Sequence, residues 1–267
     1  MGKTMLGSIS KNITKLSGLA ILYGCLSVTG VAADDLQKIK DAGELSVAMT
    51  GQYPPFSFVN ESNEVVGFDA AIGKAIADKL GVKAKIVTTP FDGIIAGLRA
   101  GKYDIIVAST AITPERAKAV DFAGPYYHAG RAIVVKHDSP ITSLNELDGK
   151  VIGVILGDTH EKWARGQGSF DLRTYKALPE MLMELNNNRI QAIIMDRIPV
   201  MVATKKTGQK IKTLETPDIE GASISVGIPL RKNNPELKQA IQTALDEMMS
   251  DGTYEKISME WIGSDIR

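Results

Sequence analysis

Residues 103–122 bring together an apolar run, a turn of small residues and one arginine, Arg116. The apolar run is typical of a buried strand, and residues 108–111 are small enough for a ligand to reach the backbone. A guanidinium is a rigid fork of donors that fits a carboxylate, and free amide N–H groups beside it complete the hydrogen bonding of the anion. The segment therefore predicts a carboxylate-binding site at Arg116. The alternative is a structural arginine at a helix start, paired with Glu115 or Asp121.

The segment lies within a pattern of alternating predicted strands and helices that occurs twice along the chain. From residue 44, short apolar runs alternate with amphipathic stretches, and a second round begins at Lys150. Strands that alternate with helices predict an α/β fold with mainly parallel sheets flanked by helices. Asp69 is predicted to cap the helix that Gly81 ends. Ligands of open parallel sheets bind beyond the carboxyl ends of the strands, and both Arg116 and the acid Asp196 fall there.

The two rounds predict two lobes joined by a two-strand hinge. Residues 96–110 and 183–197 share one order of helix end, polar turn, basic residue and buried strand. Residues 125–136 lead from one round to the other, and the apolar segment 225–230 is typical of a strand that returns. Two extended crossings make a hinge that can close on a ligand. The predicted parts are a first lobe of residues 34–126 and 226–267 and a second lobe of residues 127–225.

The first 33 residues have the pattern of a secretory signal. Lysines precede a mostly apolar stretch that ends in Val-Ala-Ala at Ala33. The only cysteine, Cys25, lies inside this stretch, so the mature chain is predicted to have no thiol for a disulfide, a metal or catalysis. We expect cleavage near Ala33 and release into the periplasm. A lipid anchor on Cys25 is the alternative.

Composition argues against several classes of partner. The chain carries 31 Lys and Arg against 31 Asp and Glu. Because three of the lysines and none of the acids lie in the first 33 residues, the remainder is slightly acidic, and we expect no nucleic-acid binding. No later segment approaches the roughly 18 unbroken apolar residues of a membrane helix. A sensor domain within a membrane receptor is therefore not expected.

The chain resembles the family 3 periplasmic solute-binding proteins, the polar amino-acid receptors of ABC importers, over essentially the whole mature sequence. Within the family it is similar to the cystine and neutral amino-acid branch. The resemblance implies a two-lobe periplasmic binding protein fold of type II, a monomer without cofactor or enzymatic activity, a free amino acid as ligand and an inner-membrane ABC permease as partner. The segments that carry it are GELSVAMTGQYPPFSF, VVGFDAAIGKAIADKLG, FDGIIAGLRAGKYDIIVASTAITPERAKAVDFAGPYY, DGKVIGVILGDT, RIQAIIMDR and DGTYEKISMEWIG.

The resemblance also implies roles for single residues. Arg116 is the expected partner of the ligand's α-carboxylate, with Ser109 and the backbone N–H of Ala111 beside it. Thr159 resembles the residue that reaches the same carboxylate from the second lobe. Asp196 resembles the acid that accepts from the α-ammonium, although an acid at a strand end can also cap the next turn. Opposite charges at the two ends of a zwitterion fix its orientation.

Other positions bear on the ligand's side chain. Relatives that bind cationic side chains tend to carry an acid where this chain has Thr50, so a neutral amino acid is predicted. Tyr53 and Phe91 resemble the aromatic walls of the pocket, although Phe91 can also be ordinary core. His160 either points into the cleft or hydrogen-bonds locally, and a lone histidine is a poor metal ligand. Ala111 replaces a Ser or Thr of many relatives, which leaves the carboxylate to amide groups.

A secreted dehydratase with the same architecture is the alternative function. Such an enzyme needs a general acid or base over its substrate. Glu161, His160 and Asp196 are the nearby candidates, and they form no recognisable catalytic pair. The sequence contains no catalytic or phosphate-binding motif of the familiar kinds.

Overall fold

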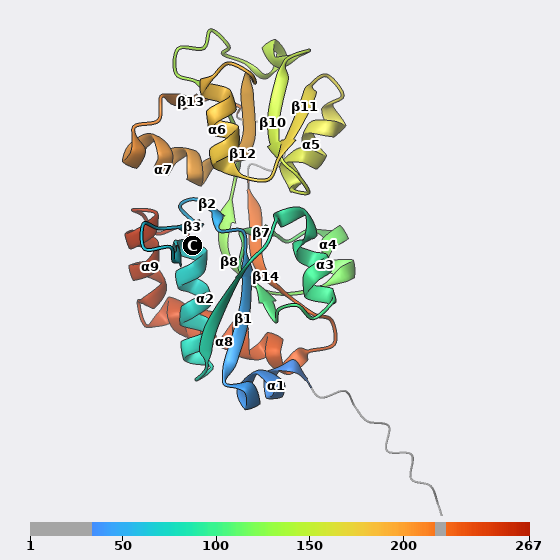
Figure 1. Ribbon diagram of the computed structural model, residues 1–267, viewed down its shortest axis with the longest axis vertical. Coiled ribbons are helices and arrows are strands. Elements are labelled where there is room, and N and C mark those ends of the chain that lie inside the picture. The colour runs from blue at the N-terminus through green and yellow to red at the C-terminus, as the bar shows by residue number, and fades with distance from the viewer. Residues whose placement is uncertain (1–33, 217–222) are drawn as a thin grey trace, which may run out of the picture. The chain divides into compact units, whose positions relative to one another are not determined.

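The computed structural model describes residues 34–216 and 223–267 (Figure 1). The predicted signal, including Cys25 and Ala33, lies outside the described residues. In the part that is described, no helix is long and apolar enough to cross a membrane.

The first sheet has the strand order β5-β1-β6-β14-β7, and β8 also pairs with β14. Its strands β5, β1 and β6 are parallel, whereas β14 runs antiparallel to β6, β7 and β8. The strands are β1 (Glu44–Met49), β5 (Lys83–Thr88), β6 (Ile105–Ile106), β7 (Thr110–Ala111), β8 (Asp121–Ala129) and β14 (Ile224–Leu230).

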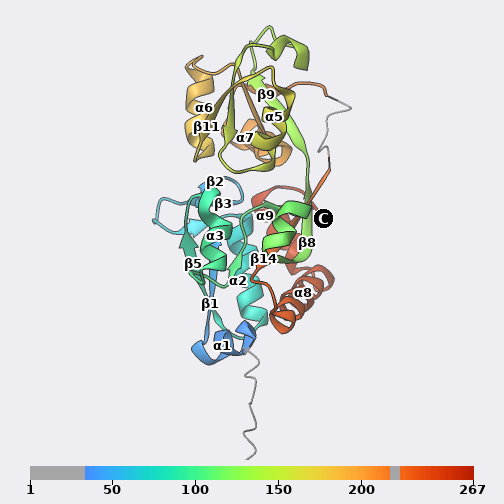
Figure 2. The ribbon, with the colours of Figure 1, turned by 90° about the vertical axis from the view of Figure 1, so that its right-hand side faces the viewer.

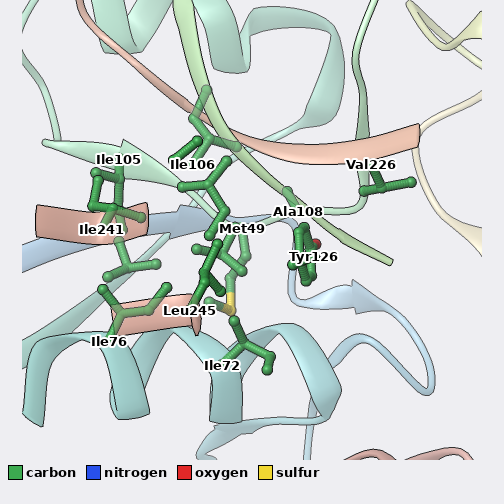
Figure 3. Close-up of a cluster of buried hydrophobic side chains, with 14 of the residues drawn as sticks. Met49, Ile72, Ile76, Ile105, Ile106, Ala108, Tyr126, Val226, Ile241 and Leu245 are labelled. Carbon is green, nitrogen blue, oxygen red and sulfur yellow. The ribbon is translucent and has the colours of Figure 1, made fainter. Parts of the chain in front are cut away.

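Helices bury an apolar stripe against this sheet. In α2 (Phe68–Lys79), Ile72 and Ile76 are fully buried one turn apart, which is the spacing that places two side chains on one helix face. Figure 3 shows them in one cluster with Met49 of β1 and with Ile241 and Leu245 of α8 (Pro235–Ser250). Figure 2 shows α8 beside β8. The other helices in the part of the protein that contains the first sheet are α1 (Asp35–Ala42), η1 (Phe91–Gly93), α3 (Ile94–Arg99), α4 (Pro114–Ala119) and α9 (Thr253–Trp261).

The second sheet has the strand order β11-β10-β12-β9-β13. Here β10 is parallel to β11 and β12, while β9 is antiparallel to β12 and β13. Alternate residues of β9 enter two core clusters: Val134 packs with residues of α6, and Ile133 with Ala164 of α5. The sheet is therefore covered on both faces. The elements are β9 (Arg131–Lys136), η2 (Leu144–Leu147), β10 (Val151–Ile155), α5 (Thr159–Gln167), β11 (Asp171–Tyr175), α6 (Leu178–Asn186), β12 (Ala192–Asp196), α7 (Arg197–Thr207) and β13 (Ile211–Thr213).

Two segments connect the sheets. β8 of the first sheet is followed, after Gly130 alone, by β9 of the second. β14 returns the chain to the first sheet after residues 217–222, which are not described. A small third sheet of antiparallel strands, β2 (Gln52–Tyr53), β3 (Ser57–Val59) and β4 (Val65–Val66), follows β1.

The structure confirms the α/β class. Each sheet has parallel strands, and the strands at the crossings run antiparallel to them, so both sheets are mixed. One detail is corrected. Asp69 is not a helix cap: α2 begins after Gly67, whose φ of 119° is accessible to glycine, and the Asp69 side chain is fully buried inside the first helical turn. A Cβ on Gly67 would lie 2.5 Å from the carbonyl oxygen of Phe56, so no larger residue fits there.

Candidate ligand-binding site

All nine residues predicted from the sequence line one pocket that receives side chains from both sheets. Their part in ligand binding remains a prediction. These residues are Thr50, Tyr53, Phe91, Ser109, Ala111, Arg116, Thr159, His160 and Asp196.

Arg116 lies in the first turn of α4, where Thr113 caps the helix by accepting a 3.1 Å hydrogen bond from the Arg116 N–H. Its Nη1 donates to the carbonyl oxygen of Ala111 at 3.0 Å, and its Nη2 donates to that of Gly157 at 3.2 Å. The guanidinium carbon lies 5.4 Å from the centre of the Phe91 ring, within reach of a cation–π attraction. These contacts use part of the fork, and its other N–H groups remain available to an anion.

The structural alternative for Arg116 is wrong. Glu115 pairs with Lys162 of α5, and Asp121 pairs with Lys232 at 2.8 Å. Burial lowers the pKa of Arg116, but a guanidinium stays charged at any physiological pH. Arg116 is thus a charged donor whose protein partners are backbone carbonyls, which leaves the positive charge available to a bound carboxylate.

Asp196 ends β12 and receives two hydrogen bonds. The hydroxyl of Tyr53 donates to its Oδ2 at 2.8 Å, and His160 Nε2 lies 3.0 Å from its Oδ1. The side chain of Asp196 is only 13% exposed. A carboxylate has roughly four lone-pair sites, so Asp196 can still accept from an ammonium group.

His160 has both ring nitrogens engaged with protein groups. Its Nδ1 accepts from Nε of Arg131 at 3.2 Å, and its Nε2 faces Asp196. Burial lowers the pKa of His160, but the carboxylates of Asp158 and Asp196 outweigh burial, and the pKa lies above its usual value. His160 thus lines the pocket while both of its ring nitrogens contact side chains from other elements, Arg131 of β9 and Asp196 of β12.

Ser109 lies in a buried hydrogen-bonded cluster. Its φ of 51° is in the left-handed region, which turns the chain sharply between β6 and β7. Its Oγ donates to Asp69 Oδ2 at 2.9 Å, its N–H donates to the Tyr126 hydroxyl at 3.2 Å, and that hydroxyl donates to Asp69 Oδ1 at 2.7 Å. The Ser109 hydroxyl proton is therefore used internally, so Ser109 faces the pocket as an acceptor.

Asp69 and Asp158 line the pocket but were not predicted as site residues. Burial raises the pKa of Asp69 to about 6, even though the hydrogen bonds from Tyr126 and Ser109 lower it. Burial likewise raises the pKa of Asp158 to about 6. Asp158 caps α5 by accepting from the N–H of Glu161 at 2.7 Å. The sequence offers one signal for Asp158 as a site residue: it lies between the end of a predicted strand and the predicted site residue Thr159.

The remaining predicted residues form the walls of the pocket. Tyr53 and Phe91 are partly buried and pack against core residues of both sheets. Thr50 Oγ1 lies 3.3 Å from Ser57 Oγ, and Thr159 is the first residue of α5. Ala111 pairs with β14. The described residues contain no group of His, Cys, Asp and Glu that could hold a metal ion.

Residues 45–264 match the family described as bacterial extracellular solute-binding proteins, family 3. The chain belongs to this family. The resemblance and the fold inferred from the sequence are thereby confirmed, and membership places this solute-binding protein outside the cytoplasm.

Relatives and solved structures agree with this assignment. The L-cystine-binding protein TcyJ of Escherichia coli (strain K12) is 35% identical over 265 residues, covering 93% of this solute-binding protein and 97% of that chain. ABC transporter arginine-binding protein 1 of the same strain is 32% identical over 223 residues, covering 82% and 91%. The crystal structure of the ancestral amino acid-binding protein AncCDT-1, a precursor of cyclohexadienyl dehydratase, superposes with a TM-score of 0.79 at 34% identity, covering 85% and 99%. These relatives are named as binding proteins.

Proposed function

We propose that the protein binds one free amino acid and delivers it to an ABC permease in the inner membrane. The observation that carries the proposal is the opposition of Arg116 and Asp196 in one pocket. Arg116 follows β7 of the first sheet, whereas Asp196 ends β12 of the second. A zwitterion placed between them satisfies both charges at once, with its carboxylate on the guanidinium and its ammonium on the acid.

The two sheets with their helices act as two lobes in this proposal. The proposed boundaries are those expected from the sequence, residues 34–126 with 226–267 and residues 127–225, so that the ends of β8 and β14 beyond them form the crossings between the lobes. Direct contacts already join the two sides: Tyr53 donates to Asp196, and Arg116 donates to the Gly157 carbonyl. A ligand that touches both sides at once adds contacts available only in the closed arrangement, so binding favours closure.

A neutral side chain is the proposed specificity. Thr50, Tyr53 and Phe91, which the resemblance assigns to the ligand's side chain, line the pocket with hydroxyl and aromatic surface rather than a carboxylate. The similarity to an L-cystine-binding protein supports cystine or a small neutral amino acid.

A cationic amino acid is the second candidate, because Asp158 also lines the pocket and a relative is named for arginine. The proposal favours the neutral ligand because the Asp158 carboxylate is already used as the cap of α5, where it accepts from the N–H of Glu161 at 2.7 Å.

Binding without catalysis is part of the proposal. Two of the three candidate acids and bases already have protein partners: His160 contacts Arg131 and Asp196, and Glu161 accepts from Gly157 and Arg165. The third, Asp196, is assigned here to the ligand's ammonium group. A catalytic acid must be free to reach the reacting atom. We also propose that the protein is a monomer released into the periplasm by cleavage near Ala33, with a lipid on Cys25 as the alternative.

Thermal shift against the common amino acids, their D-isomers and cystine tests this function. We expect a rise in melting temperature with a neutral amino acid or cystine and no turnover. A rise with arginine or lysine in place of the neutral ligands selects the second candidate. Product formation from a cyclic carboxylic acid substrate, or the absence of a shift with every amino acid, contradicts the proposal.

A further inference from the structure

Two buried side chains, Arg131 and His160, form a hydrogen-bonded chain behind Asp196. Arg131, His160 and Asp196 are joined by hydrogen bonds of 3.2 Å from Arg131 to His160 and 3.0 Å between His160 and Asp196. Arg131 is 4% exposed and His160 is 3% exposed. Arg131 begins β9 and lies directly opposite Asp196 of β12 in the antiparallel register, whereas His160 comes from the first turn of α5. Three different elements therefore meet behind one carboxylate.

The chemistry of arginine determines the direction of these hydrogen bonds. A guanidinium only donates, so His160 Nδ1 must be the acceptor of the bond from Arg131 Nε. A neutral imidazole that accepts at Nδ1 carries its proton at Nε2. His160 therefore donates to Asp196 Oδ1, just as Tyr53 donates to Oδ2. The two donors hold the carboxylate from two sides.

Arg131 is itself fixed in place. Its guanidinium carbon lies 4.6 Å from the centre of the Trp163 ring, and its Nη2 donates to the Thr159 carbonyl at 3.4 Å. Stacking on an aromatic face and a backbone acceptor together restrict the rotation of a long side chain. The ring of His160 is thereby held in one orientation.

We infer that His160, oriented by Arg131, is a positioning residue that aims the Asp196 carboxylate at the α-ammonium of the ligand. This inference rests on the proposed function, because it requires that Asp196 receives an amino acid. His160 makes no contact with the ligand in this account. It acts through the carboxylate, in the way that an outer hydrogen-bond partner fixes a binding group.

The arrangement has a pH dependence. Protonation would place a new N–H on His160 Nδ1 facing the N–H of Arg131, and the imidazolium would offset the charge of Asp196 that attracts the ligand. The charged groups facing His160 are Asp158 before α5, Asp196 at the end of β12 and Arg131 of β9, and Tyr53 of β2 faces Asp196. The pKa of His160 is raised, so the affinity is expected to fall as the pH decreases and the imidazole gains its second proton.

The test compares His160→Leu and His160→Gln by calorimetry, using the amino acid that gives the largest thermal shift with the wild type. Leucine removes both hydrogen bonds. The glutamine amide can still accept from Arg131 and donate to Asp196. We expect His160→Leu to bind about tenfold more weakly or worse at pH 8, and His160→Gln to stay within about threefold of the wild type. His137→Gln, at an exposed histidine that does not line the pocket, is the matched control.

The pH profile supplies the second readout. As the pH decreases, the wild type should lose more affinity than His160→Gln, because the variant lacks the titrating ring. Asp69 titrates in both proteins, whereas His160 lowers the pKa of Asp158, so the difference between the two profiles reports His160 together with its effect on Asp158. The comparison of wild type with His160→Gln still tests the positioning role if His160→Leu does not fold.

The outcomes separate the inference from the function on which it rests. If the wild type binds an amino acid but its pH profile equals that of His160→Gln, or if His160→Leu binds as tightly as the wild type, the positioning role is wrong. The role is also wrong if His160→Gln changes which amino acid is preferred, because His160 then touches the ligand directly. A wild type that binds no amino acid contradicts the proposed function itself.

Discussion

Gly157, in the loop after β10, approaches Asp92 of η1 so closely that a Cβ atom on Gly157 would lie 3.1 Å from the Asp92 Cα. The Gly157 carbonyl also accepts the hydrogen bond from Arg116 Nη2. Gly157 has a φ of 82°, which glycine adopts without strain. The loop after β10 in the second sheet thus meets the first sheet's side of the pocket at a residue that has no side chain.

Replacement of this glycine is predicted to impair binding more than stability. In Gly157→Ala the new methyl group meets the backbone of Asp92, so we expect the ligand affinity to fall by about tenfold, on the scale of a 1 to 2 kcal/mol steric cost. Gly149→Ala is the control, because Gly149 also has a positive φ but nothing within 4 Å of a Cβ. If calorimetry gives both variants the same affinity, the close approach has no role in binding.

Arg116 is predicted to contribute through both its charge and its fork. Arg116→Ala should weaken amino-acid binding by about 2 to 5 kcal/mol, the range for removing one partner of a buried charge pair. Arg116→Lys keeps the charge but loses the planar fork, and its affinity should lie between those of Arg116→Ala and the wild type. Arg99→Lys, at an exposed arginine that ends α3, should bind normally. Titration calorimetry that finds near-normal affinity in Arg116→Ala would refute the carboxylate assignment.

The buried carboxyl of Asp69 is predicted to make stability depend on pH. Its pKa is raised in the folded protein to about 6, so the folded state binds more protons than the unfolded state between about pH 4 and 6. Stability should therefore decrease as the pH rises through this window, by up to about 3 kcal/mol. Asp69→Asn should remove this part of the decrease, whereas Asp78→Asn, at an exposed position of the same helix, should retain it. If the melting temperatures of wild type and Asp69→Asn change equally with pH across this range, burial of the Asp69 carboxyl is not the cause.

Arg231 is predicted to stabilise the first sheet through two carboxylates. Its Nε donates to Asp35 Oδ2 at 2.8 Å and its Nη2 to Asp104 Oδ1 at 3.2 Å. Since its side chain is 20% exposed, Arg231→Leu should lower the free energy of unfolding by about 1 to 3 kcal/mol at pH 7. Lys232→Leu, which removes a more exposed ion pair with Asp121, should have little effect.

The stabilities of wild type and Arg231→Leu at acidic pH provide a second test of the role of Arg231. Burial alone would raise the pKa of Asp35, but the hydrogen bonds from Lys38 and Arg231 outweigh it, and the pKa lies below its ordinary value. Such a group contributes stability above its unfolded pKa and loses it as the pH falls through the folded pKa. The difference between wild type and Arg231→Leu should therefore shrink in denaturant titrations below about pH 4. An equal difference at pH 7 and pH 3 would mean that the carboxylate is not involved.

Local pattern was sufficient for much of the fold and for the location of the pocket. Ile72 and Ile76 recur at helical spacing between Asp69 and Gly81, which predicts a helix, and in α2 the same two side chains face the core. Arg116 and Asp196 were identified because each follows a buried strand. Strand ends meet at one edge of a sheet, so their proximity follows from the topology.

Contacts between distant segments were outside the reach of local pattern. The position of Asp69 before an apolar helical stretch predicts a helix cap. Its actual partner, Ser109, lies 40 residues later in a left-handed turn, so the sequence around Asp69 does not reveal it. The direction of β14 depends on how the chain returns after residues 217–222, which no periodicity encodes. The pairing of His160 with Arg131 depends on two elements that meet only in the second sheet.

The most direct test is a crystal structure of the protein with the amino acid selected by the thermal-shift screen. We expect the ligand carboxylate within hydrogen-bonding distance of the Arg116 guanidinium and the ligand ammonium on Asp196. A bound molecule whose carboxylate lies away from Arg116, or whose ammonium lies away from Asp196, would contradict it.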